Sequence, residues 1–217
     1  MTHLGGRPAA DGGAASSAPT ASVSGIVLAA GRSTRLGRPK QLLPLAGEPV
    51  LAHVLRHAAA SRLAEVVLVL GHAAETIAAA VGDRGQRVVV NPNFLAGQST
   101  SLRAGLAAVD RDAGAVVVLL GDQPGVTAAT IDALIAAFEG GDAPIVVPAY
   151  GGRAGNPVLF GRAVFAELGR VTGDEGARRV VRADPARVRL VDAGPGPPPG
   201  DLDTEDDYRL LRDRWRP

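Results

Sequence analysis

Residues 24–40 read SGIVLAAGRSTRLGRPK, an apolar run that leads into a loop of small and basic residues. The run from Ser24 to Ala29 predicts a β-strand, and its apolar residues follow one another without alternation. That pattern is typical of a strand covered on both faces, as in a parallel sheet between two layers of helices. The loop that follows should therefore lie beyond the carboxyl end of a strand, where ligands bind in sheets of this kind.

Short apolar runs and helical periodicity continue to alternate along the chain. Further strands are predicted at 65–70, 87–90, 115–120, 145–148 and 188–191, and helices at 49–60, 73–81, 101–109 and 127–138. Pro49 suits a first helical turn, Thr127 and Thr204 are predicted N-caps, and Asp207 completes a capping box with Thr204. The segment 193–200, AGPGPPPG, predicts an extended connection. The predicted fold class is α/β, a single open, doubly wound, mostly parallel sheet with helices on both faces.

The composition limits the class of protein. A chain of 217 residues suits one domain with a sizeable core, and 46% hydrophobic residues exclude disorder over most of its length. The net charge of +1 favours neither nucleic acid nor a membrane surface as a partner. Because there is no Cys, disulfides, thiolate nucleophiles and Cys-ligated metal sites are excluded.

The amino-terminal segment differs from the rest of the chain. Residues 1–23 are mostly Ala, Gly, Ser, Thr and Pro and lack the basic start and apolar run of a signal peptide. We therefore expect a flexible tail over 1–23 and one domain over 24–217. No apolar run approaches the roughly 20 residues of a membrane-spanning helix. These features favour a cytoplasmic protein.

The loop after the first predicted strand has the composition of a phosphate-binding loop. Gly31 and Gly37 allow tight turns that expose backbone N–H groups to an anion, and Arg32, Arg35 and Lys40 add charge. The spacing fits neither a P-loop nor a dinucleotide fingerprint. Lys40 is the only lysine among 23 basic residues, which hints that a compact ammonium group is needed there, although a chance surface lysine is the alternative.

The run from Leu28 to Lys40 resembles the LAxGxSxRMGxxK signature of the MobA-like nucleotidyltransferases, with Leu36 in place of the usual Met. The resemblance implies a Rossmann-like nucleotidyltransferase fold in which Arg35, Lys40 and Asp122 are catalytic. It also implies a set of nucleotide-binding residues: Leu28, Ala29, Ala30, Gly31, Ser33, Arg35, Lys40, Gln98, Ser101 and Asp122.

Two carboxylates are implied as metal ligands. Asp122 follows the predicted strand 115–120 within GDQP, a position that on its own suits a turn or cap residue at least as well. The resemblance implies that Asp122 binds Mg²⁺ and that Asp203, in the late turn Asp201–Thr204, completes the site. Alternatively, Asp201 and Asp203 simply flank a capping Thr204.

Two later segments, 155–160 (GNPVLF) and 173–178 (GDEGAR), resemble family elements that lie toward the acceptor substrate. They imply substrate binding by Gly155, Asn156 and Pro157 and by Gly173 and Asp174, although structural turns would explain the same residues. The resemblance implies that Gln98 and Ser101 contact the base or ribose of the nucleotide. The alternative interpretation is that they belong to an ordinary polar helix N-terminus.

Ala30 and the run Lys40–Pro44 resemble the cytidylyl-transferring branch of the family, whereas guanylyl-transferring members carry LAGG. The resemblance to molybdenum cofactor cytidylyltransferases implies CTP as the favoured donor, with GTP left open. It implies a phosphorylated pterin, molybdopterin, as the acceptor of CMP, and a molybdoenzyme or maturation factor as recipient of the product. Two alternatives stay open: transfer to another phosphorylated small molecule, and a non-catalytic nucleotide-binding protein.

Overall fold

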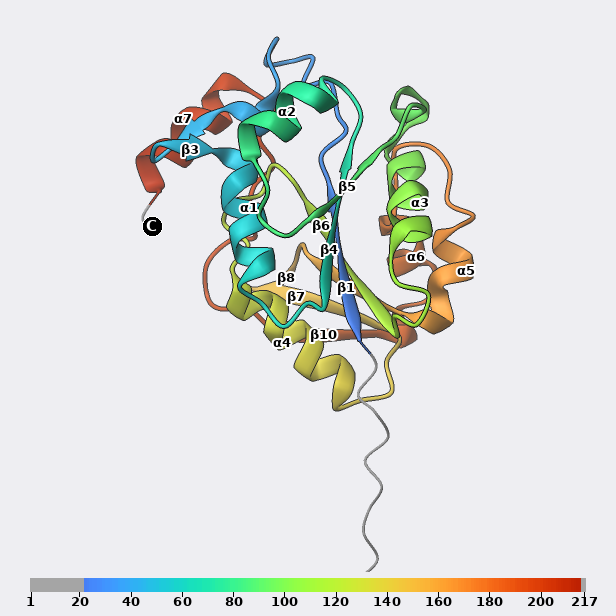
Figure 1. The fold of residues 1–217 in the computed structure, drawn as a ribbon. Helices are drawn as coiled ribbons and strands as arrows, with labels where there is room; N and C mark the ends of the chain where they lie inside the picture. The colour runs from blue at the N-terminus through green and yellow to red at the C-terminus, as the bar shows by residue number, and fades with distance from the viewer. Residues whose placement is uncertain (1–21, 216–217) are drawn as a thin grey trace, which may run out of the picture.

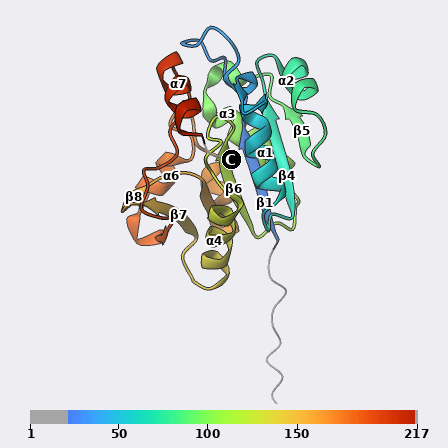
Figure 2. The same ribbon diagram turned by 90° about the vertical axis from the view of Figure 1, so that its left-hand side faces the viewer.

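The computed structural model describes residues 22–215, which form an α/β fold around one mixed sheet (Figure 1). The strand order is β10-β7-β9-β6-β1-β4-β5, and β8 pairs with β7. The bounds are β1 Val23–Leu28, β4 Glu65–Leu70, β5 Arg87–Val90, β6 Ala115–Leu120, β7 Ile145–Tyr150, β8 Arg153–Ala154, β9 Val158–Gly161 and β10 Val188–Asp192. Figure 2 shows the sheet running from β5 on one side to β7 and β8 on the other.

The central part of the sheet is parallel. Strand β1 lies between β4 and β6 and runs parallel to both, β4 pairs in parallel with β5, and β7 with β10. Strand β9 runs antiparallel between β6 and β7. The carboxyl ends of β1 and β6 therefore meet at the same edge of the sheet, with Leu28 beside Leu120.

Helices cover both faces of the sheet (Figure 1). On one face lie α1 Val50–Ala59, α2 Ala74–Val81 and α4 Ala128–Glu139, which bury Leu55, Ile77 and Ile131 against the sheet. On the other lie α3 Gln98–Ala108, α5 Phe165–Leu168 and α6 Arg178–Ala183. These two cores account for the uninterrupted apolar runs of β1, β4 and β6, because both faces of each strand are buried.

A smaller cluster holds the carboxyl-terminal helix α7, Glu205–Arg214, against a hairpin made of β2 Pro44–Leu45 and β3 Glu48–Pro49. Tyr208 of α7 is buried there with Leu43 and Leu202, and its hydroxyl donates to the carbonyl of Pro44. Short 3-10 helices complete the described structure: η1 Lys40–Leu42, η2 Phe94–Ala96, η3 Arg162–Val164 and η4 Pro185–Arg187.

The predicted fold class is confirmed, and the six predicted strands are present to within two residues at each end. The caps at Thr127 and Thr204 and the capping box with Asp207 are also confirmed. Pro49 was placed one residue too far inside α1, because it is the N-cap. Helix α3 begins at Gln98, three residues before the predicted start, which puts Gln98 and Ser101 on one turn.

Several elements were not predicted. Residues 158–160 belong to the segment predicted to bind the acceptor or to form a turn, but residues 158–161 form the buried antiparallel strand β9. Helices α5 and α6 were missed because they have only four and six residues. Of the predicted tail 1–23, residues 1–21 lie outside the described residues, and β1 begins at Val23. No helix within 22–215 is long and apolar enough to cross a membrane.

Candidate active site

The loop from Ala29 to Pro39 leaves the carboxyl end of β1 and turns back on itself through Ser33. The Ser33 carbonyl accepts hydrogen bonds from the N–H groups of Leu36 and Gly37, and its hydroxyl accepts from the N–H of Lys40 at 3.0 Å. The backbone N–H groups of residues 30–35 have no hydrogen-bond partner within 22–215. They are free to bind an anion in the manner of a backbone nest.

Gln41 fixes the first turn of this loop from beneath. Its side chain is buried, and its Nε2 donates to the carbonyls of Ala29 at 2.8 Å and Gly31 at 3.3 Å. These bonds hold the backbone before the open N–H groups in one conformation. Gln41 was not predicted as a site residue, although its position directly after the lone lysine was a usable signal.

Lys40 lies between two carboxylates that come from distant parts of the chain. Its Nζ is 2.5 Å from Asp122 Oδ2 and 3.1 Å from Asp203 Oδ1. Arg35 closes the cluster on its outer side, with one guanidinium nitrogen 2.7 Å from Asp203 Oδ2. The fold therefore brings together four residues that the sequence analysis selected separately.

Burial and charge shift the proton affinities in this cluster. Burial alone would lower the pKa of Lys40, but the charges and hydrogen bonds of Asp122 and Asp203 outweigh it and raise the pKa above 10.5. Burial raises the pKa of Asp122 above its ordinary 3.8, with Lys40 opposing that effect and the charge of Asp201 adding to it. Lys40 is thus a cation at neutral pH, and one ammonium group faces more than one carboxylate.

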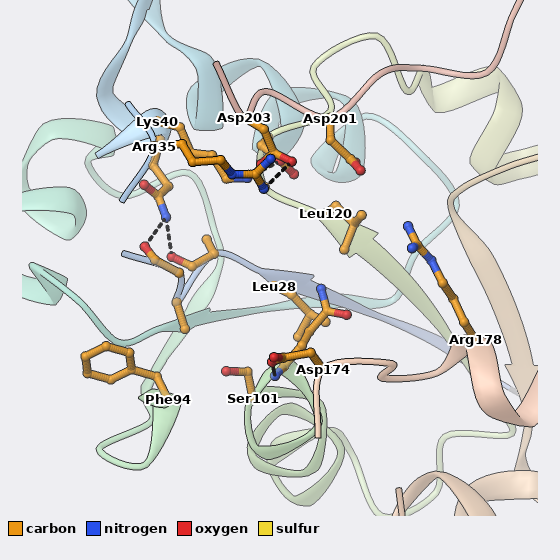
Figure 3. A pocket seen from close by; sticks show the side chains of 17 residues that line it. Leu28, Arg35, Lys40, Phe94, Ser101, Leu120, Asp174, Arg178, Asp201 and Asp203 are labelled. Atoms are coloured by element: carbon orange, nitrogen blue, oxygen red, sulfur yellow. Dashed lines mark hydrogen bonds and ion pairs between the residues drawn. The ribbon is translucent and has the colours of Figure 1, made fainter. Parts of the chain in front are cut away.

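A cavity of about 420 Å³ opens beside this cluster at the carboxyl edge of the sheet (Figure 3). Its size is in the range of small-molecule sites. Eleven of the sequence-predicted residues line it: Leu28, Ala29, Ala30, Gly31, Arg35, Lys40, Gln98, Ser101, Asp122, Asp174 and Asp203. Six residues that were not predicted complete the wall: Gln41, Phe94, Leu120, Gly121, Arg178 and Asp201.

Five other predicted residues do not line this cavity. Ser33 faces the N–H of Lys40 instead, and Gly173 supports the site from behind, because its carbonyl accepts from the N–H of Ser99. Gly155 packs against Tyr150 and Pro198, and Pro157 follows a cis peptide bond. Asn156 lines a smaller recess that adjoins the cavity.

Helix α3 supplies the polar groups on the floor of the cavity. Buried Asn91 donates from its Nδ2 to the hydroxyls of Thr100 at 2.9 Å and Ser101 at 3.0 Å. The Ser101 hydroxyl is an acceptor in that bond, so its own hydrogen remains available to a ligand. The N–H of Gln98 is bound by Asp174 Oδ1 at 3.2 Å, which ties the start of α3 to the loop before α6.

Asp122 and Asp203 are the residues that fit a divalent cation. Their carboxylates converge on one atom, Lys40 Nζ, and burial raises the pKa of Asp122 although Lys40 opposes that effect. Within 22–215 no group of three or more His, Cys, Asp or Glu residues could hold a metal alone. Two carboxylates nevertheless suit a Mg²⁺-type ion that takes its other ligands from substrate phosphates and water.

Comparison with known proteins assigns the chain to a family. A family model described as the MobA-like NTP transferase domain matches residues 25–189. The chain belongs to the MobA-like NTP transferase family. The match begins in β1 and ends in β10, so it includes at least part of every strand of the sheet.

Relatives with solved structures agree with this assignment. Rv0371c from Mycobacterium tuberculosis H37Rv, solved in complex with manganese, is 39% identical with a TM-score of 0.79 over 89% of this chain and 100% of that one. A nucleotidyl transferase from Methanothermobacter thermautotroptrophicus is 26% identical with a TM-score of 0.74, covering 88% of this chain and 96% of its own. The fold described above is therefore a nucleotidyltransferase fold.

One relative carries a name from a different class of enzyme. Nicotine blue oxidoreductase from Paenarthrobacter nicotinovorans is 35% identical over 202 residues, which span 87% of this chain and 96% of that protein. A protein named for redox chemistry therefore resembles this chain over nearly its whole length, and the family assignment by itself does not fix the reaction.

Proposed function

We propose that this protein is a Mg²⁺-dependent nucleotidyltransferase that moves CMP from CTP to the terminal phosphate of molybdopterin and releases pyrophosphate. The observation that carries the proposal is the convergence, in one cavity, of a loop with open N–H groups, a lysine and two carboxylates. A nucleoside triphosphate and a divalent cation need this combination, because the phosphates need donors and the cation needs oxygen ligands.

The reaction joins two anions, and the chain's own residues reduce their repulsion. An oxygen of the acceptor phosphate bonds to the α-phosphorus while the bond from that phosphorus to the β-phosphate oxygen breaks, so pyrophosphate leaves. Lys40 and Arg35 offset charge on the reacting and leaving phosphates, and the loop N–H groups hold them in place. A metal held by Asp122 and Asp203 would polarise the phosphate oxygens. The acceptor is already ionised, so we assign no general base.

The donor base is assigned to helix α3 and the first turn of the loop. Ser101 can donate from its hydroxyl, and Gln98 offers an amide at the start of the same helix. Ala30, which resembles the cytidylyl branch, is buried and lines the same cavity. These features support CTP as the donor, with GTP as the alternative that the titration below distinguishes.

The oxidoreductase name of a relative that aligns over nearly the whole chain supports a second candidate, a redox enzyme acting on a flat pigment-like substrate. The loop lacks the Gly-x-Gly-x-x-Gly spacing that binds a dinucleotide cofactor, and the chain has no Cys. Binding of NADH or NADPH with no binding of nucleoside triphosphates would favour this candidate over the first.

The decisive experiment is a calorimetric titration of the wild-type protein with CTP, GTP, ATP and UTP in Mg²⁺, followed by the Asp122→Asn variant. We expect selective CTP binding in the wild type and its loss or strong weakening in the variant. Asp142→Asn, the same change at an exposed site in the turn before β7, is the matched control. GTP preference would move the assignment to guanylyl transfer, and no binding at all would refute a transferase. Product analysis with molybdopterin then tests the acceptor.

A further inference from the structure

Strand β5 forms one edge of the sheet and exposes apolar side chains there (Figure 2). Val88 is 40% exposed and Val90 is 58% exposed, and they lie on the same face of the strand because successive side chains alternate. Leu95, shortly after the strand, is 70% exposed. Single apolar residues are common on a protein surface, but a group of them at a free strand edge indicates an interaction surface.

The outer edge of β5 also carries unpaired backbone groups. The N–H of Asn91 donates to the carbonyl of Leu70 in β4, so the backbone groups of Val89 also face β4, two residues earlier on the strand. The N–H and C=O groups of Val88 and Val90 therefore face away from the sheet. No other described strand pairs with that side of β5. The two exposed valines are thus the residues whose backbone can bind a further strand.

Strand β5 lacks the features that usually prevent an edge strand from pairing. Such strands are protected by charged side chains, Pro, bulges or a covering element. Within β5 there is no Pro, and its one charge, Arg87, is paired with Glu65 of the neighbouring strand β4. Strand β10, at the opposite edge, instead carries Arg189 and Asp192. Of the two edges, β5 is therefore the one that can approach an identical strand without repulsion.

We propose that two copies of this chain pair through antiparallel β5 strands and form a dimer with one continuous sheet. A two-fold axis at Val89 places Val88 opposite Val90 of the partner subunit, and Val90 opposite the partner's Val88. Because both residues face outward, each of these pairs exchanges both of its backbone hydrogen bonds. The paired segment ends at Pro92, which has no N–H to donate.

The sequence of β5 is complementary to itself about Val89, which favours a second copy over an unrelated strand. The exposed valines meet each other across the axis. Arg87 lies opposite Asn91 of the partner subunit, so the two arginines of the dimer do not face each other. An interface this narrow belongs to the weak end of protein–protein contacts, and the dimer should therefore dissociate on dilution.

Sedimentation equilibrium between about 1 and about 200 µM tests the dimer, because weak interfaces dissociate within this range. We expect the mass to rise from 22.0 kDa toward twice that value. Val88→Lys with Val90→Lys should abolish the rise, since like charges then oppose each other, whereas Val88→Lys with Val90→Glu should restore it, since Lys then faces Glu. Leu190→Lys, the same kind of change at an exposed residue of β10, is the matched control and should leave the rise unchanged.

A cysteine on the axis tests the register, because the chain has no Cys of its own. In Val89→Cys the two thiols lie opposite each other in a pair without hydrogen bonds, where Cα atoms are about 4.5 Å apart and a disulfide can form. Oxidation with diamide should therefore link this variant into a covalent dimer, and should link Val88→Cys much more slowly.

Three results would overturn the proposal. The first is a mass of 22.0 kDa at every concentration. The second is a dimer that persists when Lys replaces both exposed valines, or that is linked through Val88→Cys and not through Val89→Cys. The third is a dimer that appears only after residues 1–21 are deleted, because that segment would then be the occupant of the β5 edge in the full chain.

Discussion

Lys40 holds together two carboxylates that would otherwise repel each other at the carboxyl edge of the sheet. A lysine suits this position because its ammonium is a compact charge with three donors that can reach two acceptors at once. Every other basic residue with a long side chain is Arg, which makes the choice of Lys here specific. A divalent cation held by the same carboxylates would release the ammonium toward the phosphates of the proposed substrate. Lys40 would then link metal binding to phosphate binding.

Replacing Lys40 with Met should lower the free energy of unfolding by about 2 to 3 kcal/mol, because buried Asp122 loses its counter-ion. A divalent cation should then raise the melting temperature of the variant more than that of the wild type, since it replaces the missing charge. Thermal unfolding with Mn²⁺ and with EDTA measures both effects. Arg38→Met is the control, because it removes an exposed ion pair with Glu205, worth about 1 kcal/mol or less, and a cation–π contact with Tyr208, neither of which involves Asp122. An equal response of wild type and Lys40→Met to the metal would contradict this account.

Glu65 gives a prediction about acid stability. Burial would raise its pKa, but hydrogen bonds from the N–H of Asp110, the hydroxyl of Ser24 and the guanidinium of Arg87 hold the pKa below 4.5. A carboxyl with a lowered folded-state pKa stabilises the fold above its unfolded pKa, and this stability is lost as the pH falls through the folded value. Between about pH 5 and pH 3, Glu65→Gln should therefore lose less stability than the wild type. Denaturant unfolding between about pH 5 and pH 3 measures this difference in the loss of stability. Glu75→Gln, at an exposed position, is the control.

The sequence analysis found those site residues that belong to a recognisable motif after a predicted strand. Lys40 and Asp122 each follow a predicted strand and belong to a recognisable pattern. Arg178 and Asp201 were missed as site residues because they become part of the cavity only through long-range packing. Arg178 lies on a helix too short to predict, and Asp201 is positioned by the Gln123 amide, which donates to its Oδ1 at 2.7 Å.

Among the elements, buried parallel strands were predicted best, because their apolar runs are uninterrupted. Strand β9 was missed because Val158–Gly161 has only four residues and directly follows Pro157. Its antiparallel insertion between β6 and β7 depends on pairing with residues far away in the chain, such as Gly161 with Ala115, 46 positions earlier. Local periodicity carries no information about such pairing.

Helix α7 positions Asp203 through its cap. The Thr204 hydroxyl accepts from the N–H of Asp207, while Asp207 Oδ2 accepts from the N–H groups of Thr204 at 2.8 Å and Asp203 at 3.2 Å. This capping box therefore fixes the backbone that carries the second carboxylate of the site. An ordinary helix cap and the proposed metal-ligand turn are therefore the same structure.

Thr204→Ala should lower the free energy of unfolding by about 1 kcal/mol and also weaken Mn²⁺ binding in the presence of CTP, because the Asp203 turn loosens. Thr204→Ser keeps the capping oxygen and should restore both properties. Thr127→Ala removes the side-chain cap of α4, which bonds to Thr130 and to neither Asp122 nor Asp203, and should cost similar stability with no change in Mn²⁺ affinity. A loss of stability in Thr204→Ala with unchanged Mn²⁺ affinity would show that the cap stabilises α7 but does not position Asp203 for metal binding.

At the scale of the whole molecule, the cavity is assembled from segments that the sheet holds together. The loop after β1, the start of α3, the turn after β6, the start of α6 and the turn before α7 all contribute to its wall. A ligand that contacts these segments stabilises the entire fold, because they separate when the sheet unfolds. We therefore expect the fold to melt in a single cooperative transition, and ligand binding should raise its melting temperature.

With CTP at 100 times its dissociation constant in Mg²⁺, the free energy of unfolding should increase by about 2.7 kcal/mol. For a domain of this size that corresponds to a rise of roughly 5 to 10 °C in the melting temperature. EDTA should remove most of the rise, because the carboxylates hold the cation that the triphosphate shares. Asp122→Asn should show little rise with or without metal, whereas Asp142→Asn should match the wild type. A full, metal-independent rise in Asp122→Asn would mean that CTP binds through the loop alone and that the carboxylates serve another purpose.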